Sequence, residues 1–221
     1  MSQTPLLFLH VTKTAGGSIK ELVRNVPAKV RMHYPSEDGW RRDFKYPLEY
    51  DIYFGHFLYG VHESLGVNPR YAAFVRDPVA RTVSHFNHLK NNDRGPVGDK
   101  ARAAGDLQTY IYSIRRWEMD NFMCRMFSGV GNKVPFGEVG WNVYKLALEN
   151  INNNFAFVGV FEHMQESLTK LKGIIPIDVS ALPEVNIGQY KKEIDANTKE
   201  LVESLTCFDQ MLYNKVLASY E

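Results

Sequence analysis

The pattern that most constrains this chain is a set of short, continuously apolar runs, each followed by polar residues and then by a helical pattern. The runs are PLLFLHV at 5–11, YDIYFG at 50–55, YAAFVR at 71–76 and FAFVGV at 155–160. Short apolar runs without alternation are typical of strands that are buried on both faces of a parallel sheet. Strands that alternate with helices predict an α/β fold with a mostly parallel central sheet.

Turn and helix signals define the remaining elements. A short strand is expected at 28–33, helices at 17–25, 78–90, 163–173 and 195–218, and two or three more helices within 106–152. Helices therefore flank the sheet and dominate the C-terminal half. The polar, glycine-containing stretches 91–105 and 174–192 are predicted to be loops. Because the 221 residues contain no repeat or low-complexity tract, we expect a single domain spanning 1–221.

The composition excludes several classes of protein. A formal net charge of +1 argues against nucleic-acid binding by bulk electrostatics, so any anion site must be built locally. The two cysteines, Cys124 and Cys207, argue against a disulfide scaffold, and the seven histidines show no clear metal-ligand spacing, so no metal is expected. Without a signal-peptide pattern or an apolar run of roughly 18 residues, the chain is expected to be soluble and cytoplasmic.

The turn TKTAGGS at 12–18 has the composition of a phosphate-binding turn between a strand and a helix. The Walker A pattern G-x-x-x-x-G-K-S/T is absent, because aligning Lys13 and Thr14 with its last two positions places Leu7 and Thr12 where glycines are required. The turn is nevertheless P-loop-like, since free N–H groups and the dipole at the start of a helix favour an anion.

Each side chain of this turn has an expected role. Gly16 and Gly17 would let the backbone approach an anion, Thr14 and Ser18 would supply hydroxyl donors, and Lys13 would supply a positive charge. The alternative interpretation is an ordinary strand–helix turn with a solvated lysine.

A second basic motif, FVRDPVARTVSHF, follows the strand at 71–76. Arg76 at the end of this strand and Ser84 eight residues later are predicted to meet at one phosphate, for which arginine is suited. Asp77 precedes Pro78 and is interpreted as the N-cap of the following helix. Arg81 is interpreted as structural support rather than as a ligand contact.

These motifs, taken in order, resemble those of the sulfotransferases, in particular the heparan sulfate 2-O-sulfotransferase-like branch and its bacterial relatives. The segments that carry the resemblance are HVTKTAGGSIKELV, DIYFGHFLYGVH, FVRDPVARTVSHF, MDNFMCRMFSG and FAFVGVFEHMQESLTKL. They extend over nearly the whole chain. Thr12 stands where the family commonly has proline.

The resemblance implies a sulfotransferase that uses 3′-phosphoadenosine 5′-phosphosulfate (PAPS) as donor and releases adenosine 3′,5′-bisphosphate. It implies that the 5′-phosphosulfate is held by Lys13, Thr14, Ala15, Gly16, Gly17 and Ser18. It implies that Arg76 and Ser84 hold the 3′-phosphate, and no metal is required.

Transfer to a hydroxyl group needs a base, and His56 is the best candidate. It follows the strand at 50–55, so it should lie at the carboxyl edge of the sheet, and it matches the catalytic histidine of the resembling branch. Lys13 would assist at the leaving phosphate oxygen. His62 is a second candidate for the base or for contact with substrate. His10 is expected to be a core histidine inside the first strand.

The acceptor is a hydroxyl compound, for which a carbohydrate, a glycolipid and a small metabolite all stay open. Trp40 and Arg41 in DGWRRDFKY could meet a sugar ring and an anionic group, or could belong to a solvated loop with one packed tryptophan. Asn121 and Arg125 lie one turn apart on a predicted helix, where they would approach the donor or the acceptor, or form a helix-surface pair.

Two other functions compete with sulfuryl transfer. An ATP-dependent phosphotransferase would need magnesium and lacks the Walker glycines. A catalytically silent nucleotide-binding module would keep the fold without the chemistry, but Lys13, His56, Arg76 and Ser84 are all present.

Overall fold

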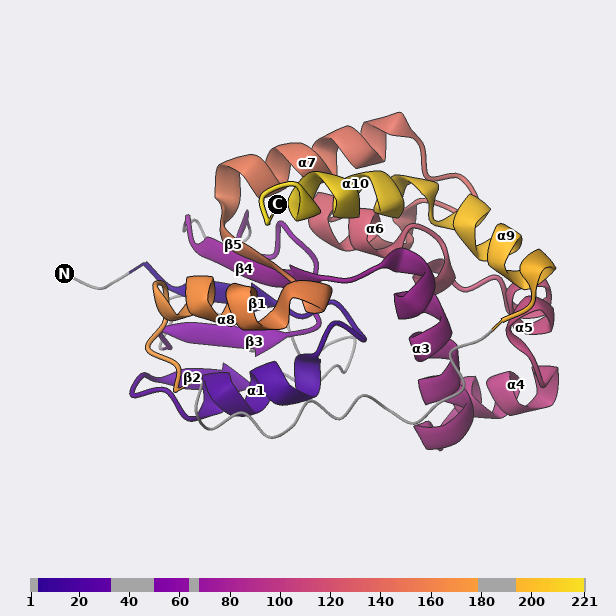
Figure 1. Ribbon diagram of the computed structural model, residues 1–221, viewed down its shortest axis with the longest axis horizontal. Coiled ribbons are helices and arrows are strands. Elements are labelled where there is room, and N and C mark those ends of the chain that lie inside the picture. The colour runs from indigo at the N-terminus through magenta and orange to yellow at the C-terminus, as the bar shows by residue number, and fades with distance from the viewer. Residues whose placement is uncertain (1–3, 33–49, 64–67, 179–193, 221) are drawn as a thin grey trace.

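The structure is a computed structural model that describes residues 4–32, 50–63, 68–178 and 194–220 (Figure 1). Its centre is a five-stranded sheet in the order β2-β3-β1-β4-β5, in which all neighbours are parallel. The strands are β1 Leu6–Leu9, β2 Val30–Met32, β3 Ile52–Gly55, β4 Arg70–Val75 and β5 Phe155–Val160. The predicted α/β class and the five predicted strands are confirmed.

Helices cover both faces of the sheet, as Figure 1 shows. On one face lie α1 Gly16–Arg24 and α8 Met164–Lys172, and on the other lie α6 Phe122–Ser128, α7 Trp141–Asn154 and α10 Cys207–Leu217. Because successive strand residues point to opposite faces, Leu6 and Phe8 pack in the core under α1 and α8, whereas Leu7 and Leu9 pack in the other core. Two-sided burial explains why the strands are continuously apolar.

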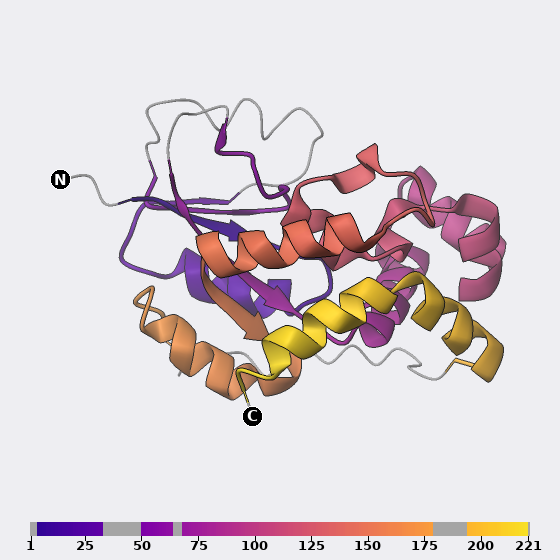
Figure 2. The same ribbon diagram turned by 90° about the horizontal axis from the view of Figure 1, so that it is seen from above.

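A third hydrophobic cluster lies beside the carboxyl end of the sheet, as both views show (Figure 2). It is formed by α3 Pro78–Asn92, α4 Pro96–Ala104, α5 Leu107–Ile114, the short helix η2 Trp117–Met119 and α9 Ala196–Leu205. Two further short helices are η3 Gly131–Lys133 and η4 Phe161–His163. The third cluster places a helical layer next to the edge where the site motifs lie.

Two predicted elements are wrong. The stretch predicted as a loop at 91–105 contains α4, whose Ala101 is fully buried in the third cluster. The single helix predicted at 195–218 is two helices, α9 and α10, separated at Thr206. Asn121 accepts hydrogen bonds from the N–H groups of Phe208 and Asp209. A residue distant in the sequence therefore caps the start of α10, which makes α10 a separate helix from α9.

Most of the predicted loop 174–192 lies outside the described residues. Within the described part of the chain, no helix combines the length and the apolar character needed to cross a bilayer.

Candidate anion-binding and catalytic site

The turn between β1 and α1 is held in an unusual backbone conformation. Lys13 and Ala15 both have left-handed backbones, with φ of 71° and 68°. Such conformations are costly for residues with a Cβ, persist only where the surrounding structure imposes them, and cluster at ligand sites. Between them, the buried Thr14 donates its hydroxyl proton to the carbonyl of Val11 at 2.8 Å. The Thr14 hydroxyl therefore stabilises the turn. Its hydrogen is directed to the Val11 carbonyl and not to an anion, in contrast to the prediction.

The start of α1 carries no side-chain cap. Its cap residue, Ala15, has no acceptor, and the first turn contains no acidic side chain. By contrast, α3, α5 and α9 each begin at an aspartate whose carboxylate accepts a backbone N–H. The N–H groups of Gly16, Gly17 and Ser18 thus have no intrahelical acceptor and no cap, which is the arrangement that favours a phosphate or sulfate group.

Gly16 is required for a reason that the sequence did not indicate. A Cβ at this position would lie 1.6 Å from Nε2 of His10, so the His10 ring covers the glycine directly. At Gly17, in contrast, a Cβ would meet nothing within 4 Å. Close approach of an anion, the predicted reason for both glycines, stays a prediction.

Arg76, the first residue after β4, is tied to the turn at β1. Its Nη1 donates to the carbonyl of Lys13 at 3.0 Å, and its guanidinium lies 4.2 Å from the ring centroid of Phe161. Its Nε is buried and has no hydrogen-bond partner among the described residues. The arginine is therefore positioned on two sides and keeps one buried donor for a further contact.

Lys13 and Arg76 place two cations close together in a partly buried setting. Burial, followed by the charge of Arg76, lowers the pKa of Lys13. Burial likewise lowers the pKa of Arg76, and the nearby carboxylates of Glu162 and Asp77 offset part of that effect. Within the described residues, no carboxylate forms an ion pair with either cation. An anion between them would relieve both shifts.

Helix α3 begins as predicted. Asp77 is its N-cap and accepts a hydrogen bond from the N–H of Ala80 at 2.8 Å. Arg81 is fully buried and donates to the carbonyl of Glu118 at 2.6 Å, which confirms its structural interpretation. Ser84 lies on the same helix and is partly buried; its joint contact with Arg76 at a phosphate stays a prediction.

His56 follows β3 at the carboxyl edge of the sheet, where it was expected. Its Nδ1 lies 2.9 Å from the carbonyl oxygen of His10. Because a carbonyl can only accept, Nδ1 carries the hydrogen and Nε2 carries the lone pair of the neutral ring. His56 is thus in the tautomer that a general base needs at Nε2.

His10 is not the satisfied core histidine that the sequence predicted. β1 ends at Leu9, so His10 lies just beyond the strand, where its ring stacks on that of His56 at a centroid distance of 4.3 Å. Its Nε2 is buried and has no hydrogen-bond partner among the described residues. Burial lowers the pKa of His10 well below 6.5, and His56 and Lys13 lower it further.

The two histidines open onto a pocket of about 170 Å³ beside the start of α1. Its lining residues are His10, Gly16, Gly17, Lys20, Met32, Phe54 and His56. The candidate base and the uncapped helix start therefore face the same small space. Lys20 adds a cation to the lining and was missed at the sequence level, although its place one turn after Gly16 on the helix could have indicated it.

His62 lies elsewhere. Its Nδ1 is 2.7 Å from the hydroxyl of Tyr71, which is the second residue of β4. The hydrogen bond therefore ties His62 to the amino half of the sheet, whereas His56 follows the carboxyl end of β3. His62 therefore does not share the pocket that His56 lines, and its role as a second base or a substrate contact stays a prediction.

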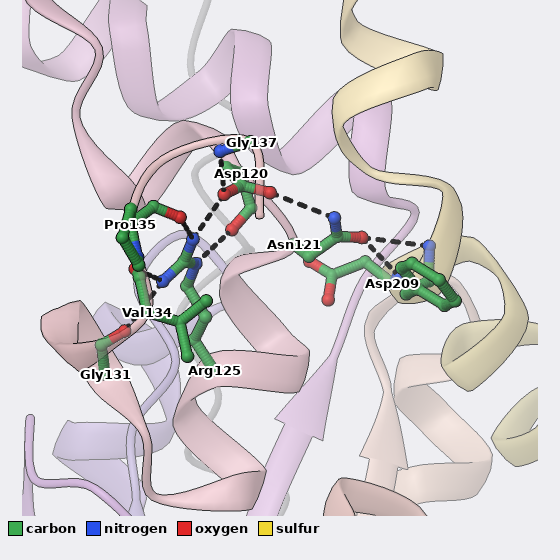
Figure 3. A network of polar contacts seen from close by, with 9 residues as sticks. Asp120, Asn121, Arg125, Gly131, Val134, Pro135, Gly137 and Asp209 are labelled. Carbon is green, nitrogen blue, oxygen red and sulfur yellow. Dashed lines mark hydrogen bonds and ion pairs between the residues drawn. The ribbon is translucent and has the colours of Figure 1, made fainter. Parts of the chain in front are cut away.

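Asn121 and Arg125 are buried, and Figure 3 shows the network of polar contacts that they form with neighbouring residues. Arg125 forms an ion pair with Asp120 and donates further hydrogen bonds to the carbonyls of Asp120, Gly131, Val134 and Pro135. The amide of Asn121 donates to Asp120 and accepts from the start of α10. No donor of Arg125 is left for a ligand, so the predicted substrate role of this pair is wrong.

Trp40 and Arg41 lie outside the described residues, so their proposed contact with an acceptor stays a prediction. Within the described ranges, no group of three or more His, Cys, Asp or Glu side chains is arranged to hold a metal ion.

Comparison with known proteins gives a consistent set of relatives. No protein-family model matches the chain. The chain is 26% identical over 131 residues to heparan sulfate 2-O-sulfotransferase hst-2 of Caenorhabditis elegans, covering 57% of this chain and 40% of that protein. It is 24% identical over 194 residues to heparan sulfate 2-O-sulfotransferase 1 of Gallus gallus, covering 77% of this chain and 54% of that protein.

Its curated relatives are heparan sulfate 2-O-sulfotransferases. The resemblance that the motifs carry is thereby confirmed. The chain spans about half the length of these sulfotransferases, 40% and 54% in the two cases. Among solved structures, mouse sulfotransferase SULT7A1 complexed with PAP aligns with a TM-score of 0.47 and 18% identity, covering 95% of this chain and 67% of that chain.

Proposed function

We propose that this chain is a sulfotransferase that moves the sulfuryl group of PAPS to a hydroxyl group of a carbohydrate acceptor. The observation that carries the proposal is the link between Lys13 and Arg76: two partly buried cations, joined through the Lys13 carbonyl, beside an uncapped helix start. Without a Walker A loop, this arrangement suits a donor that has two separate anionic ends rather than a triphosphate with magnesium.

The residues present fit such a donor. The N–H groups of the turn and of the first turn of α1, together with Lys13, would hold the 5′-phosphosulfate. Arg76 and Ser84 would hold the 3′-phosphate, and the unpartnered buried Nε of Arg76 provides a donor for it. When bound, PAPS supplies the sulfuryl group and leaves as adenosine 3′,5′-bisphosphate.

The side chains of this chain would then perform two tasks. Nε2 of His56 accepts the proton of the acceptor hydroxyl, since the hydrogen on Nδ1 is held by the His10 carbonyl. The ammonium group of Lys13 stabilises negative charge on the leaving phosphate oxygen in a partly buried setting, where such charge stabilisation is strongest. Burial and the charge of Arg76 lower the pKa of Lys13, and a bound anion would counteract this effect.

The proposed acceptor class is supported by the relatives, which are heparan sulfate 2-O-sulfotransferases. A carbohydrate hydroxyl is therefore the first acceptor to test, followed by glycolipids and small metabolites. The formal net charge of +1 gives no general attraction for a long polyanion, so contacts with a charged glycan would be local.

The donor site is tested by calorimetric titration with adenosine 3′,5′-bisphosphate, with ATP–magnesium alongside. We expect micromolar binding of the bisphosphate to the wild type, loss of binding in Arg76→Ala, and no change in the control Arg24→Ala, whose side chain is exposed at the end of α1. Binding of ATP–magnesium without the bisphosphate would overturn the proposal and favour a phosphotransferase.

Turnover is tested by release of the bisphosphate from PAPS with desulfated heparan oligosaccharides as acceptor. We expect His56→Gln to abolish release while it keeps bisphosphate affinity. Donor binding without turnover on any of the three acceptor classes would favour a silent nucleotide-binding module.

A further inference from the structure

One residue controls two features of the candidate base. The backbone carbonyl of His10 accepts the Nδ1 hydrogen of His56, and the His10 ring stacks on the His56 ring with a centroid distance of 4.3 Å and an interplanar angle of 29°. The first contact selects the tautomer of His56, and the second fixes the plane of its ring. Together they determine the direction in which Nε2 of His56 presents its lone pair.

His10 is itself held in place by its surroundings. Its ring covers Gly16, where even a Cβ would lie 1.6 Å from Nε2, and contacts the ring of Phe54 at a centroid distance of 5.2 Å. The buried Nε2 of His10 has no hydrogen-bond partner among the described residues, and leaving a buried polar atom unpaired costs free energy. A leucine or phenylalanine would fill the same space without this cost, so stability alone does not account for histidine here.

The charges around His10 disfavour a proton on its ring. Two imidazolium rings 4.3 Å apart would repel each other, so the stack favours at most one proton. The other cations that face His10 are Lys13 from the turn and Lys20 from α1, and both disfavour a proton on it. Burial acts in the same direction. Burial, the stacked His56 ring and the two lysines therefore all keep His10 neutral.

We propose that His10 is a positioning residue for this site: its stacked ring and its carbonyl together orient His56 so that Nε2 presents its lone pair. The consequence for turnover rests on the proposed function. The orientation and the tautomer of His56 belong to the ligand-free protein and are measured without turnover.

The first test is a pH titration of the ring ¹⁵N and ¹³C resonances of both histidines by NMR in the ligand-free wild type. We expect the neutral His56 ring to carry its hydrogen on Nδ1, and His10, whose pKa burial lowers well below 6.5, to stay neutral while the unfolded chain takes up its protons. A His56 tautomer with hydrogen on Nε2 would overturn the proposal.

The second test compares His10→Phe, which retains a stacked ring, with His10→Leu, which does not. Because stacked pairs contribute modestly, we expect kcat to fall about tenfold in His10→Leu and less than threefold in His10→Phe, with KM for PAPS unchanged in both. His62→Leu, which alters a histidine away from the site, is the matched control and should retain kcat.

The outcomes separate the two proposals. Equal kcat and equal His56 titration in His10→Leu and the wild type would overturn the positioning role. An inactive wild type with the expected NMR titration would instead contradict the proposed reaction and leave the histidine pair established. If His10→Leu does not fold, the wild-type titration together with His10→Phe decides the question.

Discussion

The guanidinium of Arg76 lies 4.2 Å from the ring centroid of Phe161, and this contact joins two neighbouring strands at the candidate donor site. Arg76 follows β4 and Phe161 follows β5, which pair in parallel, so both residues leave the sheet at the same edge. The ring supports the guanidinium on one side, and the Lys13 carbonyl fixes Nη1. The arginine is therefore oriented before a ligand arrives, which reduces the entropy lost on binding.

Removal of this ring should weaken donor binding. We expect Phe161→Leu to raise the Kd for adenosine 3′,5′-bisphosphate about threefold to tenfold, because a partly buried cation–π contact contributes roughly 1 kcal/mol. Calorimetric titration measures the change. The matched control is Tyr220→Leu, which removes the ring beneath Lys170, where Nζ lies 3.6 Å from the centroid. Equal affinities in Phe161→Leu and the wild type would show that the ring does not orient Arg76.

Arg125 should govern stability and not ligand affinity. Its removal in Arg125→Met leaves Asp120 buried without its cationic partner, so we expect the free energy of unfolding to fall by about 3–5 kcal/mol. Urea denaturation measures this loss, and the bisphosphate affinity of the folded fraction should not change. The exposed Arg24→Met serves as control, with an expected loss below about 1 kcal/mol. A large loss of affinity without loss of stability would restore the substrate role predicted from sequence.

The sequence predicted the sheet because its signals are local. Each strand is a continuous apolar run, and the turn at 12–18 is recognised by its small residues and its place between a strand and a helix. The role of Arg125 was not predictable in this way. Its carbonyl partners at 131, 134 and 135 follow the end of α6, and no residue pattern specifies which backbone groups a buried guanidinium will meet.

The position of His10 depends on where the first strand ends, and the observed end lies two residues before the predicted one. The apolar run continues to Val11, so the sequence placed His10 inside a strand. β1 ends at Leu9, level with Gly55 at the end of β3, and the N–H of His10 donates to the Gly55 carbonyl. His10 therefore leaves the sheet beside His56. Strand boundaries are the least certain part of sequence-based interpretation, and here the boundary separates a core residue from a site residue.

The conformation of the turn should depend on the Thr14 hydroxyl. Thr14→Val retains the shape of the side chain but removes the donor to the Val11 carbonyl, so we expect the free energy of unfolding to fall by about 1–3 kcal/mol. Thr14→Ser retains the donor and should lose less. Thermal or urea denaturation distinguishes the two variants. Equal stability of Thr14→Val and the wild type would indicate that the left-handed residues on either side hold the turn without this hydrogen bond.

Stability should decline below neutral pH, and His85 on α3 should cause part of the decline. His85 is buried, and neither ring nitrogen has a hydrogen-bond partner among the described residues. Burial lowers its pKa well below 6.5, and the nearby groups Arg81, His88, Lys13 and Arg116 act in the same direction. The unfolded chain therefore binds a proton in a pH range where folded His85 does not. This contribution to stability is complete above pH 6.5 and is lost progressively as the pH falls below it.

Substitution of this histidine by an apolar residue should remove its share of the pH dependence. Between pH 7.5 and 5.5, we expect the free energy of unfolding of His85→Leu to fall by about 1.4 kcal/mol less than that of the wild type, as measured by urea denaturation at both pH values. His10 should contribute with the same sign in both proteins, because its pKa is also lowered well below 6.5. Equal pH dependence in the variant and the wild type would mean that folded His85 takes up a proton as readily as the unfolded chain does.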